Sequence, residues 1–182
     1  VALGSYSIKA VVTDNSGKSS SDGRTVVVSP PQTAYKGVVS KIPGKIEFEN
    51  YDVCGNGCAY FDDSEGNDGG ASFRTDEDVD IEDCTDDGAG YNLGWATAGE
   101  WVEYTVDVES PGIYDLVVRA ASENANTLSM TVDGKEIVKP IAIPVTGGWQ
   151  KWQDVKVAGV NLNAGRQVIR VTFGAKYVNL NY

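Results

Sequence analysis

The chain contains no histidine, and this absence removes the most common general base and the most common transition-metal ligand together. With only three cysteines to supply ligands, a zinc site is disfavoured, and cysteine-based catalysis would lack its partner base. No Gly-rich phosphate loop lies between a strand and a helix, and no G-x-S-x-G elbow occurs. These gaps favour a function other than catalysis. A catalytic Asp/Glu pair of the glycosidase type remains an alternative, because carboxylates are abundant.

Positive charge and long apolar runs are also scarce. The chain has 15 Lys and Arg against 26 Asp and Glu, for a formal net charge of −11. Phosphates would be repelled, so we expect neither nucleic acid nor an anionic membrane as a partner. No stretch approaches the roughly 20 apolar residues of a membrane span, and no signal segment is visible. The chain starts at Val1 without an initiator Met, which indicates a fragment of a longer protein.

Three cysteines, Cys54, Cys58 and Cys84, lie in one short part of the chain. Their clustering predicts local bridging and an oxidising compartment, and therefore a secreted, extracellular protein. The spacing permits a Cys54–Cys58 loop or a bridge from either residue to Cys84. The cysteines bracket residues 61–91, which are rich in Asp and Gly and have little regular pattern. Loops of this length are usually functional or disordered.

Residues 1–30 carry the pattern of a β-hairpin. Apolar residues alternate from Tyr6 to Val12, a polar turn follows, and a second apolar segment runs back. The stretch GSYSIKAVVTDNSGKSS resembles the last two strands of Ig-like domains in secreted bacterial enzymes, so we expect the C-terminal hairpin of a truncated domain. Residues 31–44, which begin with a proline and are largely polar, are expected to form a linker.

Residues 45–182 give almost only β signals. The segments KIEFENYDV and WVEYTVDV alternate, and LSMTVDGKEIV contains two short strands about an Asp-Gly turn. No window holds a convincing helical period. Regular short strands with turn signals predict an all-β fold, an antiparallel β-sandwich of the jelly-roll type, which we expect to be a monomer.

Two groups of acidic residues invite a metal interpretation. Glu47 and Glu49 stand two apart in a predicted strand, so both would point to one side, where Ca²⁺ would relieve their repulsion. The alternative is a solvated strand face. Asp76, Asp78 and Asp80 share a similar spacing but lack the glycine and terminal glutamate of an EF-hand loop, so that motif is rejected.

The four tryptophans cannot be sorted by pattern. Most tryptophans in a sandwich belong to the core. Strand parity counted back from Val155 and Val157 would put Trp149 rather than Trp152 on the apolar face. Trp149, however, directly follows two glycines, where regular strand pairing has not necessarily begun. Periodicity therefore leaves the role of Trp149 open.

Several ordered motifs in residues 45–182 resemble family 6 carbohydrate-binding modules. They are KIEFENY, YNLGWATAGEWVEYTVDV, PGIYDLVVRAAS, IPVTGGWQKWQDV and VNLNY. The related family 35 shares this framework, but GGWQKW and GEWVEY favour family 6. The resemblance implies a jelly-roll module without catalytic activity, attached in cis to a secreted polysaccharide-degrading enzyme.

The resemblance also implies a sugar cleft among the loops at one edge of the sandwich. Trp149 of GGWQ would be the aromatic platform, and Asn179 of VNLNY would hydrogen-bond the sugar hydroxyls. Trp95 stands where the family usually has tyrosine, so either Trp95 or Tyr91 would be the second aromatic. A pyranose has an apolar face and a rim of hydroxyls, which suits flat rings and short amides.

The remaining assignments also follow from the resemblance. Trp101 and Trp152 fall to the core by the family's pattern, while Asp62, Asp63 and Asp68 of the acidic loop would rim the cleft. In the family, the two acids of the E-x-E strand help to bind a structural calcium, which favours the metal interpretation of the pair in KIEFENY.

The expected ligand is an algal polysaccharide, either an agarose-type galactan or a β-1,3-glucan. Xylan and cellulose are the alternatives within the family. Two other functions compete with glycan binding. The chain could be an enzyme with a hidden carboxylate pair, or a structural spacer that holds other domains apart.

Overall fold

The computed structural model describes residues 4–28 and 30–182. The chain divides into two compact units, Val1–Pro31 and Gln32–Tyr182. Strands dominate both units, and the helical elements of the described residues are two 3₁₀ turns, η1 (Tyr35–Gly37) and η2 (Phe48–Asn50). The all-β prediction is confirmed. Among the described residues, no helix has the length and apolarity that crossing a membrane requires.

The first unit is a two-stranded antiparallel hairpin of β1 (Gly4–Thr13) and β2 (Ser19–Val28). Its turn is closed by Asp14, whose Oδ1 accepts hydrogen bonds from the backbone N–H groups of Ser16 and Lys18 at 2.8 and 2.9 Å. Asp favours turns because its side chain can accept from nearby backbone N–H groups in place of strand pairing. The returning strand begins at Ser19, well before the apolar segment over residues 25–28 that the sequence pattern predicts. The Ig-like origin of this hairpin stays a prediction.

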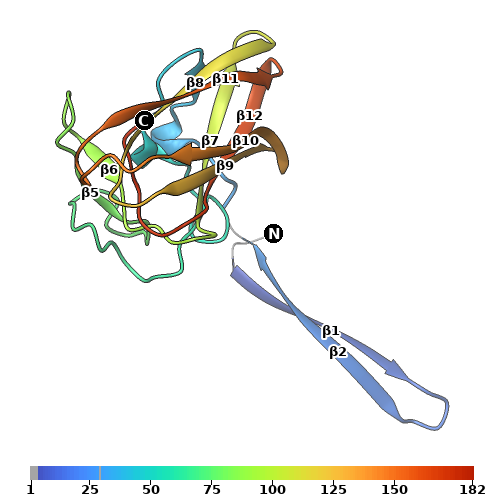
Figure 1. Cartoon of the computed structure of the whole chain (residues 1–182). Coiled ribbons are helices and arrows are strands. Elements are labelled where there is room, and N and C mark those ends of the chain that lie inside the picture. Colours follow the sequence, from blue (N-terminus) through green and yellow to red (C-terminus); the bar gives the residue numbers. More distant parts are fainter. Residues whose placement is uncertain (1–3, 29) are drawn as a thin grey trace. The chain divides into compact units, whose positions relative to one another are not determined.

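The second unit consists of two packed sheets (Figure 1). One sheet has the strand order β10-β9-β12-β7-β3, with β4 also paired to β7, and the other has the order β11-β8-β13-β6-β5. All of these pairs are antiparallel except the parallel β3–β7 pair. The strands are β3 (Ser40–Ile42), β4 (Tyr60–Phe61), β5 (Ile81–Asp83), β6 (Tyr91–Leu93), β7 (Trp101–Val108), β8 (Gly112–Ala121), β9 (Asn126–Val132), β10 (Lys135–Ile143), β11 (Gln153–Leu162), β12 (Gly165–Phe173) and β13 (Asn179–Leu180).

The predicted linker over residues 31–44 is largely wrong. Thr33 forms an isolated bridge with Val53, and β3 pairs with β7 over Ser40–Ile42. Polar composition alone does not separate a linker from an edge strand, because an edge strand also presents polar side chains to water.

Buried and exposed side chains alternate along the long strands, and the buried ones form the core. In β7, Val102, Tyr104, Val106 and Val108 are at most 5% exposed, whereas Asp107 between them is exposed. Each such side chain contributes roughly 1.5–3 kcal/mol by leaving water. The Tyr104 hydroxyl donates to a backbone carbonyl of η2 at 2.8 Å, so this polar atom is satisfied inside the core.

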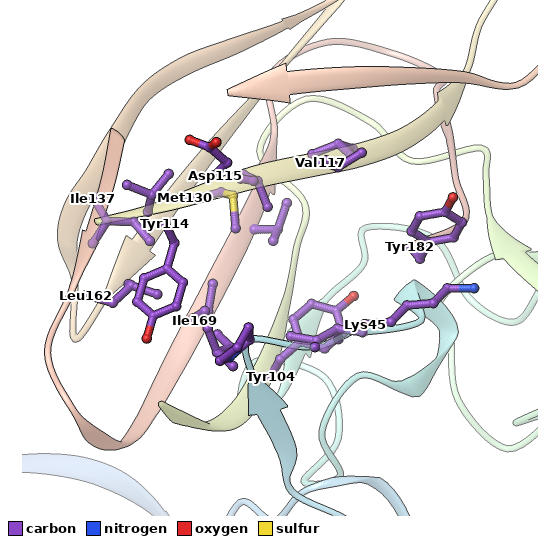
Figure 2. A pocket seen from close by; sticks show the side chains of 18 of the residues that line it. Lys45, Tyr104, Tyr114, Asp115, Val117, Met130, Ile137, Leu162, Ile169 and Tyr182 are labelled. Carbon is purple, nitrogen blue, oxygen red and sulfur yellow. The ribbon is translucent and has the colours of Figure 1, made fainter. Parts of the chain in front are cut away.

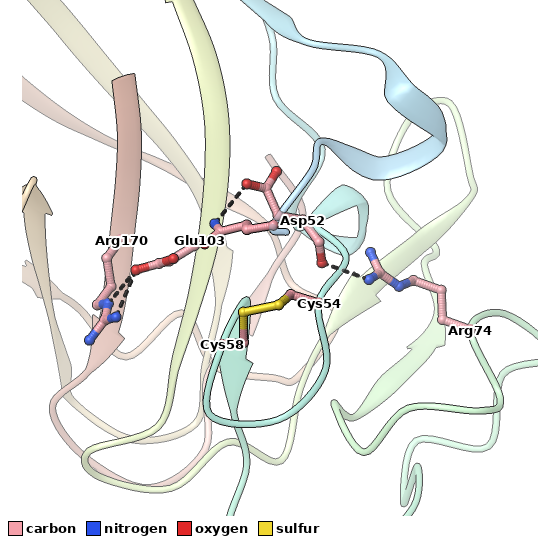
Figure 3. The surroundings of a disulfide bond; sticks show 7 residues. Asp52, Cys54, Cys58, Arg74, Glu103 and Arg170 are labelled. Atoms are coloured by element: carbon pink, nitrogen blue, oxygen red, sulfur yellow. Dashed lines mark hydrogen bonds and ion pairs between the residues drawn. A yellow bond between two sulfur atoms is a disulfide. The ribbon is translucent and has the colours of Figure 1, made fainter. Parts of the chain in front are cut away.

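The cysteines form one bridge, Cys54–Cys58, with a Cα–Cα distance of 5.5 Å, and Cys84 is a buried free thiol. Of the alternatives that the sequence left open, the structure selects the four-residue loop. Figure 3 shows that the bridge lies near the Arg74 guanidinium. Arg74 donates to the Asp52 carbonyl at 3.0 Å, and its Cζ lies 3.4 Å from the centre of the Tyr51 ring.

The acidic loop between β4 and β6 is therefore anchored from inside. The Arg74 side chain, only 4% exposed, pairs with Glu77. The Asn67 side-chain oxygen accepts from the backbone N–H groups of Gly69 and Ile81, both at 2.8 Å. These bonds satisfy backbone donors that a loop would otherwise leave to water. The loop thus has a defined conformation held by its own side chains.

Candidate functional site

Trp149 and Asn179, which are 30 residues apart, meet at one edge of the sandwich. Asn179 lies in β13, is 3% exposed, and donates from Nδ2 to the Trp149 carbonyl at 2.6 Å. Trp149 is half-buried in the loop between β10 and β11, outside the core. The pair that the sequence singled out is therefore brought together.

Two glycines and one ring contact shape the loop that carries Trp149. Gly147 has a φ of +89°, a conformation that an L side chain rarely adopts. A Cβ on Gly148 would come 3.2 Å from the Lys151 side chain, so that glycine permits close packing. The Trp149 ring meets the Tyr177 ring edge to face, with 6.4 Å between centroids. The indole orientation is thus supported by its neighbours.

Trp95 directly follows a glycine that lies against the same amide. Gly94 lies directly under Asn179, because a Cβ at Gly94 would come 2.9 Å from the Asn179 Oδ1. Trp95 follows with a φ of +48° and is 37% exposed. A bulky residue at positive φ costs energy and is typical of functional sites. Asn179 therefore contacts the backbone carbonyl of Trp149 and the glycine that precedes Trp95.

Tyr91, the other candidate for the second aromatic, has a different environment. It lies in β6 and stacks on Phe73, with ring centroids 4.5 Å apart and planes inclined by 24°. Phe73 in turn contacts Tyr35. Tyr91 is therefore part of the packing of the acidic loop, while Trp95 follows the glycine that lies against Asn179.

A carboxylate that the sequence did not single out lies at the centre of this site. Glu82 of β5 accepts three hydrogen bonds on its Oε1, from Nδ2 of Asn92 at 3.1 Å, Nε2 of Gln150 at 2.7 Å and Nδ2 of Asn179 at 2.5 Å. No hydrogen bond to its Oε2 exists among residues 4–28 and 30–182. No sequence signal marks Glu82, since Asn179 is 97 residues away.

The acidic-loop residues Asp62 and Asp63 form a second cluster with Glu100. Their ligand oxygens all lie within 4.8 Å of one another. Burial raises the pKa of Asp62, and it raises the pKa of Glu100 to about 7. Thr97 joins this cluster by donating to Asp63 Oδ2 at 3.1 Å. Asp62 and Asp63 are thus placed against Glu100, and no hydrogen bond joins them to Trp149 or Asn179 in the described part of the chain.

Asp68, the third predicted rim residue, also serves the loop itself. Its backbone N–H donates to Asp80 Oδ1 at 2.6 Å. Burial is the main reason that the pKa of Asp80 rises to about 6, and the nearby Asp62 and Asp68 add to it.

The Glu47 and Glu49 side chains do not follow the expected strand alternation, because residues 48–50 form the η2 turn. Glu47 pairs with Lys45 at 2.9 Å. Glu49 is 8% exposed, and burial raises its pKa to about 7. Its Oε2 is the sole buried side-chain nitrogen or oxygen without a hydrogen bond in the described residues. A buried oxygen left without a partner, beside a second carboxylate, fits a hard cation.

Trp101 and Trp152 do not belong to the buried core, so that prediction is wrong. Both are half-buried. The Arg170 guanidinium lies over the Trp101 ring, 3.6 Å from its centre, and Arg170 pairs with Glu103 at 2.7 Å (Figure 3). The Trp152 Nε1 donates to Gln150 Oε1 at 3.2 Å. The cation over the Trp101 ring and the acceptor for the Trp152 Nε1 allow both indoles to stay near the surface.

A separate cavity of about 480 Å³ lies between the sheets (Figure 2). Its lining is mainly apolar core, including Leu128, Ile169 and Val171, with Lys45 and Tyr182 at one side. Neither Trp95, Trp149 nor Asn179 lines it. The cavity also lacks the set of amides and carboxylates that the hydroxyl rim of a sugar needs. The candidate site is therefore the edge of the sandwich, outside this cavity.

A family model described as "Carbohydrate binding module (family 6)" matches residues 70–182. Two solved structures of this kind are similar to the chain. The module CBM6cm-2 from Cellvibrio mixtus lichenase 5A, in complex with cellotriose, is 37% identical with a TM-score of 0.52. The match covers 57% of this chain and 82% of that one. The C-terminal module of the marine laminarinase LamC from Zobellia galactanivorans is 30% identical with a TM-score of 0.53, over 58% and 85%.

Curated relatives match over part of their length. The clotting factor G alpha subunit of Tachypleus tridentatus is 32% identical over 114 residues, which is 61% of this chain and 17% of that protein. The beta-agarase AgaA of Microbulbifer thermotolerans is 32% identical over 66 residues, 35% of this chain and 15% of the agarase. The match thus spans less than a fifth of either relative.

Proposed function

The chain belongs to carbohydrate-binding module family 6, and from this premise we propose that it holds a polysaccharide at the edge formed by Trp95, Trp149 and Asn179. The family is one of non-catalytic binding modules. The observation that carries the proposal is the Asn179 amide, which is bonded to the Trp149 backbone and lies under the Gly94–Trp95 turn. The Trp149 carbonyl and the Gly94–Trp95 turn thus flank one buried amide.

This arrangement suits a pyranose for a physical reason. Indole faces bury the C–H face of the ring at little cost in rotamer entropy. Both Asn179 Nδ2 hydrogens are already donated to Glu82 and to the Trp149 carbonyl, so Asn179 Oδ1 and Glu82 Oε2 are the acceptors that we assign to the hydroxyl rim. No proton transfer is needed for binding. We expect modest affinity, roughly micromolar to millimolar, which corresponds to about 4–8 kcal/mol.

As ligand we propose an algal polysaccharide, a β-1,3-glucan or an agarose-type galactan. The relatives that support these choices are a marine laminarinase module and an agarase. A cellulose or xylan chain is the alternative, and the lichenase module in complex with cellotriose favours the former. A panel of laminari-, neoagaro-, cello- and xylo-hexaose in isothermal titration decides among them.

We propose that the module is a monomer that acts in cis, as a secreted accessory to a glycoside hydrolase. Attachment would raise the effective concentration of the catalytic domain at an insoluble polymer. The disulfide supports an oxidising compartment. Retention of the chain on polysaccharide gels, without release of reducing ends, is the expected result. Release of reducing ends would favour an enzyme, and no binding to any glycan would favour a spacer.

We also propose that Glu47 and Glu49 hold a structural Ca²⁺. The unpartnered Glu49 Oε2 and the adjacent carboxylate support this proposal. When bound, the ion would neutralise the two carboxylates and tie the η2 turn in place. Glycan binding would not involve it directly. Titration with CaCl₂ after chelation, followed by calorimetry, tests the site.

A further inference from the structure

Gln150, which directly follows Trp149, makes an unusually complete set of hydrogen bonds with one side chain. Its Nε2 donates to Glu82 Oε1 at 2.7 Å and to Asn92 Oδ1 at 3.1 Å. Its Oε1 accepts from the Thr85 backbone N–H at 2.9 Å and hydroxyl at 3.0 Å, and from Trp152 Nε1 at 3.2 Å. One neutral amide thus joins the Trp149 loop to the β5 and β6 side of the site.

The donors fix which way this amide points. Three donors converge on the Gln150 Oε1, so the nitrogen must face the Glu82 carboxylate. On the other side, Glu82 Oε1 receives Gln150, Asn92 and Asn179 together. All three bonds are on one oxygen, which leaves Oε2 without a hydrogen bond in the described residues. The carboxylate is therefore held in one orientation with one oxygen spare.

We propose that Gln150 is a positioning residue of the glycan site, which acts through Glu82 and Trp149 and does not touch the sugar. This inference rests on the proposed function. Gln150 aims the free oxygen of Glu82 at a ligand hydroxyl and fixes the loop that carries the Trp149 platform. The site is then preorganised, so binding orders few groups and little of the interaction energy is lost.

The local chemistry favours this role over simple packing. Gln150 is half-buried, and its contacts are polar at both ends of the amide. A side chain that merely filled space would be replaceable by a methionine of similar volume. A positioning side chain would not be, because methionine removes one of the three donors to Glu82 and the acceptor of the Trp152 N–H.

The first experiment replaces the amide without changing its volume much. Gln150→Met is compared with Gln153→Met, a matched change at an exposed residue three positions later. Laminari- and neoagaro-hexaose are titrated into each variant by calorimetry. We expect Gln150→Met to weaken binding about tenfold or more and Gln153→Met to leave it unchanged. Equal affinity of the two variants overturns the proposal.

A second variant separates positioning from folding through pH. Gln150→Glu keeps the shape but places a carboxylate against Glu82, which is the one charged hydrogen-bond partner of the Gln150 side chain in the described residues; Thr85, Asn92 and Trp152 are neutral. Asn92 and Asn179, which also face Glu82, are neutral too, while the Cys84 thiol is a nearby titratable group. Two adjacent carboxylates cannot both ionise cheaply, so a proton is shared at lower pH.

We expect Gln150→Glu to weaken glycan binding by at least about tenfold near pH 8 and to recover much of it near pH 5, relative to the unaltered chain at each pH. A loss that is the same at both pH values, or no loss at pH 8, contradicts the proposal. If the unaltered chain binds no glycan in the panel, the proposed function itself fails. If it binds and the Gln150 variants bind equally, only this inference fails.

Discussion

Two carboxylates in this molecule, the half-buried Glu82 and the buried Glu49, differ in how many hydrogen-bond donors they receive. Glu82 receives three side-chain N–H donors on one oxygen. Glu49 has a buried oxygen with no partner, and burial raises its pKa to about 7. A carboxylate supported by neutral amides is ready for a neutral ligand with hydroxyls, whereas one left without donors calls for a cation. This difference is the basis for proposing a sugar ligand beside Glu82 and a cation beside Glu49.

The largest effect should come from removing the aromatic platform beside the Glu82 network. We expect Trp149→Ala to weaken glycan binding at least about 100-fold, roughly 3 kcal/mol, because a large apolar contact is lost. Affinity electrophoresis and calorimetry measure it. Val145→Ala, an exposed apolar change in the same loop, is the control. Unchanged retention of Trp149→Ala would remove the site from this edge.

The next effect tests the Glu49 side of the comparison. At free Ca²⁺ about 100-fold above the dissociation constant, bound ion should stabilise the fold by about 2.7 kcal/mol, and chelation should lower Tm by about 5–10 °C. Glu49→Gln should abolish this shift, while Glu136→Gln, at an exposed position on β10, should keep it. A shift that survives in Glu49→Gln would place the ion elsewhere, for example at Asp62, Asp63 and Glu100.

A smaller loss is expected when Glu82 itself changes. Glu82→Gln replaces the free oxygen by an amide nitrogen, so a hydroxyl donor loses its acceptor, and binding should weaken by about tenfold. Asp83→Asn, at the exposed neighbour on β5, is the matched control. If both variants bind as well as the original chain, the Glu82 oxygen does not meet the ligand.

The smallest effect concerns a third carboxylate, Asp86, whose negative charge is paired with the Arg119 guanidinium. Hydrogen bonding from the Arg119 guanidinium, at 2.7 Å, lowers its pKa to about 2. Because the Asp86 pKa is lower in the folded state, the ionised carboxylate stabilises the fold at pH values above its unfolded-state pKa. This stabilisation is lost as the pH falls from about 4 to 2.

Acid unfolding monitored by circular dichroism should show this loss, about 1–2 kcal/mol because Arg119 is partly exposed. Asp86→Asn should remove that part of the pH dependence and lower the stability at neutral pH. Asp115→Asn, at an exposed position on β8, should not. Equal pH profiles for the two variants would show that the Arg119 pairing contributes nothing measurable.

The comparison also shows where sequence reasoning succeeds. Alternation in WVEYTVDV correctly predicts the buried face of β7, because neighbours on a strand point to opposite sides. The Asp133–Gly134 turn is likewise local, since both residues have positive φ. The pairing of Trp149 with Asn179 came from resemblance, and the contact between them is present.

Sequence reasoning failed where structure depends on distant partners. Trp101 and Trp152 were assigned to the core, yet Arg170 and Gln150 hold them near the surface. Glu47 and Glu49 were expected to alternate along a strand, yet a 3₁₀ turn intervenes. Their neighbours in the chain carry no sign of either outcome.

By itself, the sequence determined that this protein is all-β, where its hairpins turn, and that it has no histidine for acid–base chemistry. Those properties depend on composition and on residues a few positions apart. Only the tertiary structure decided that Glu82, Gln150 and Asn179 share one network. The strand order β8-β13-β6-β5 sets these side chains together, and strand order is settled by long-range pairing that no local pattern encodes.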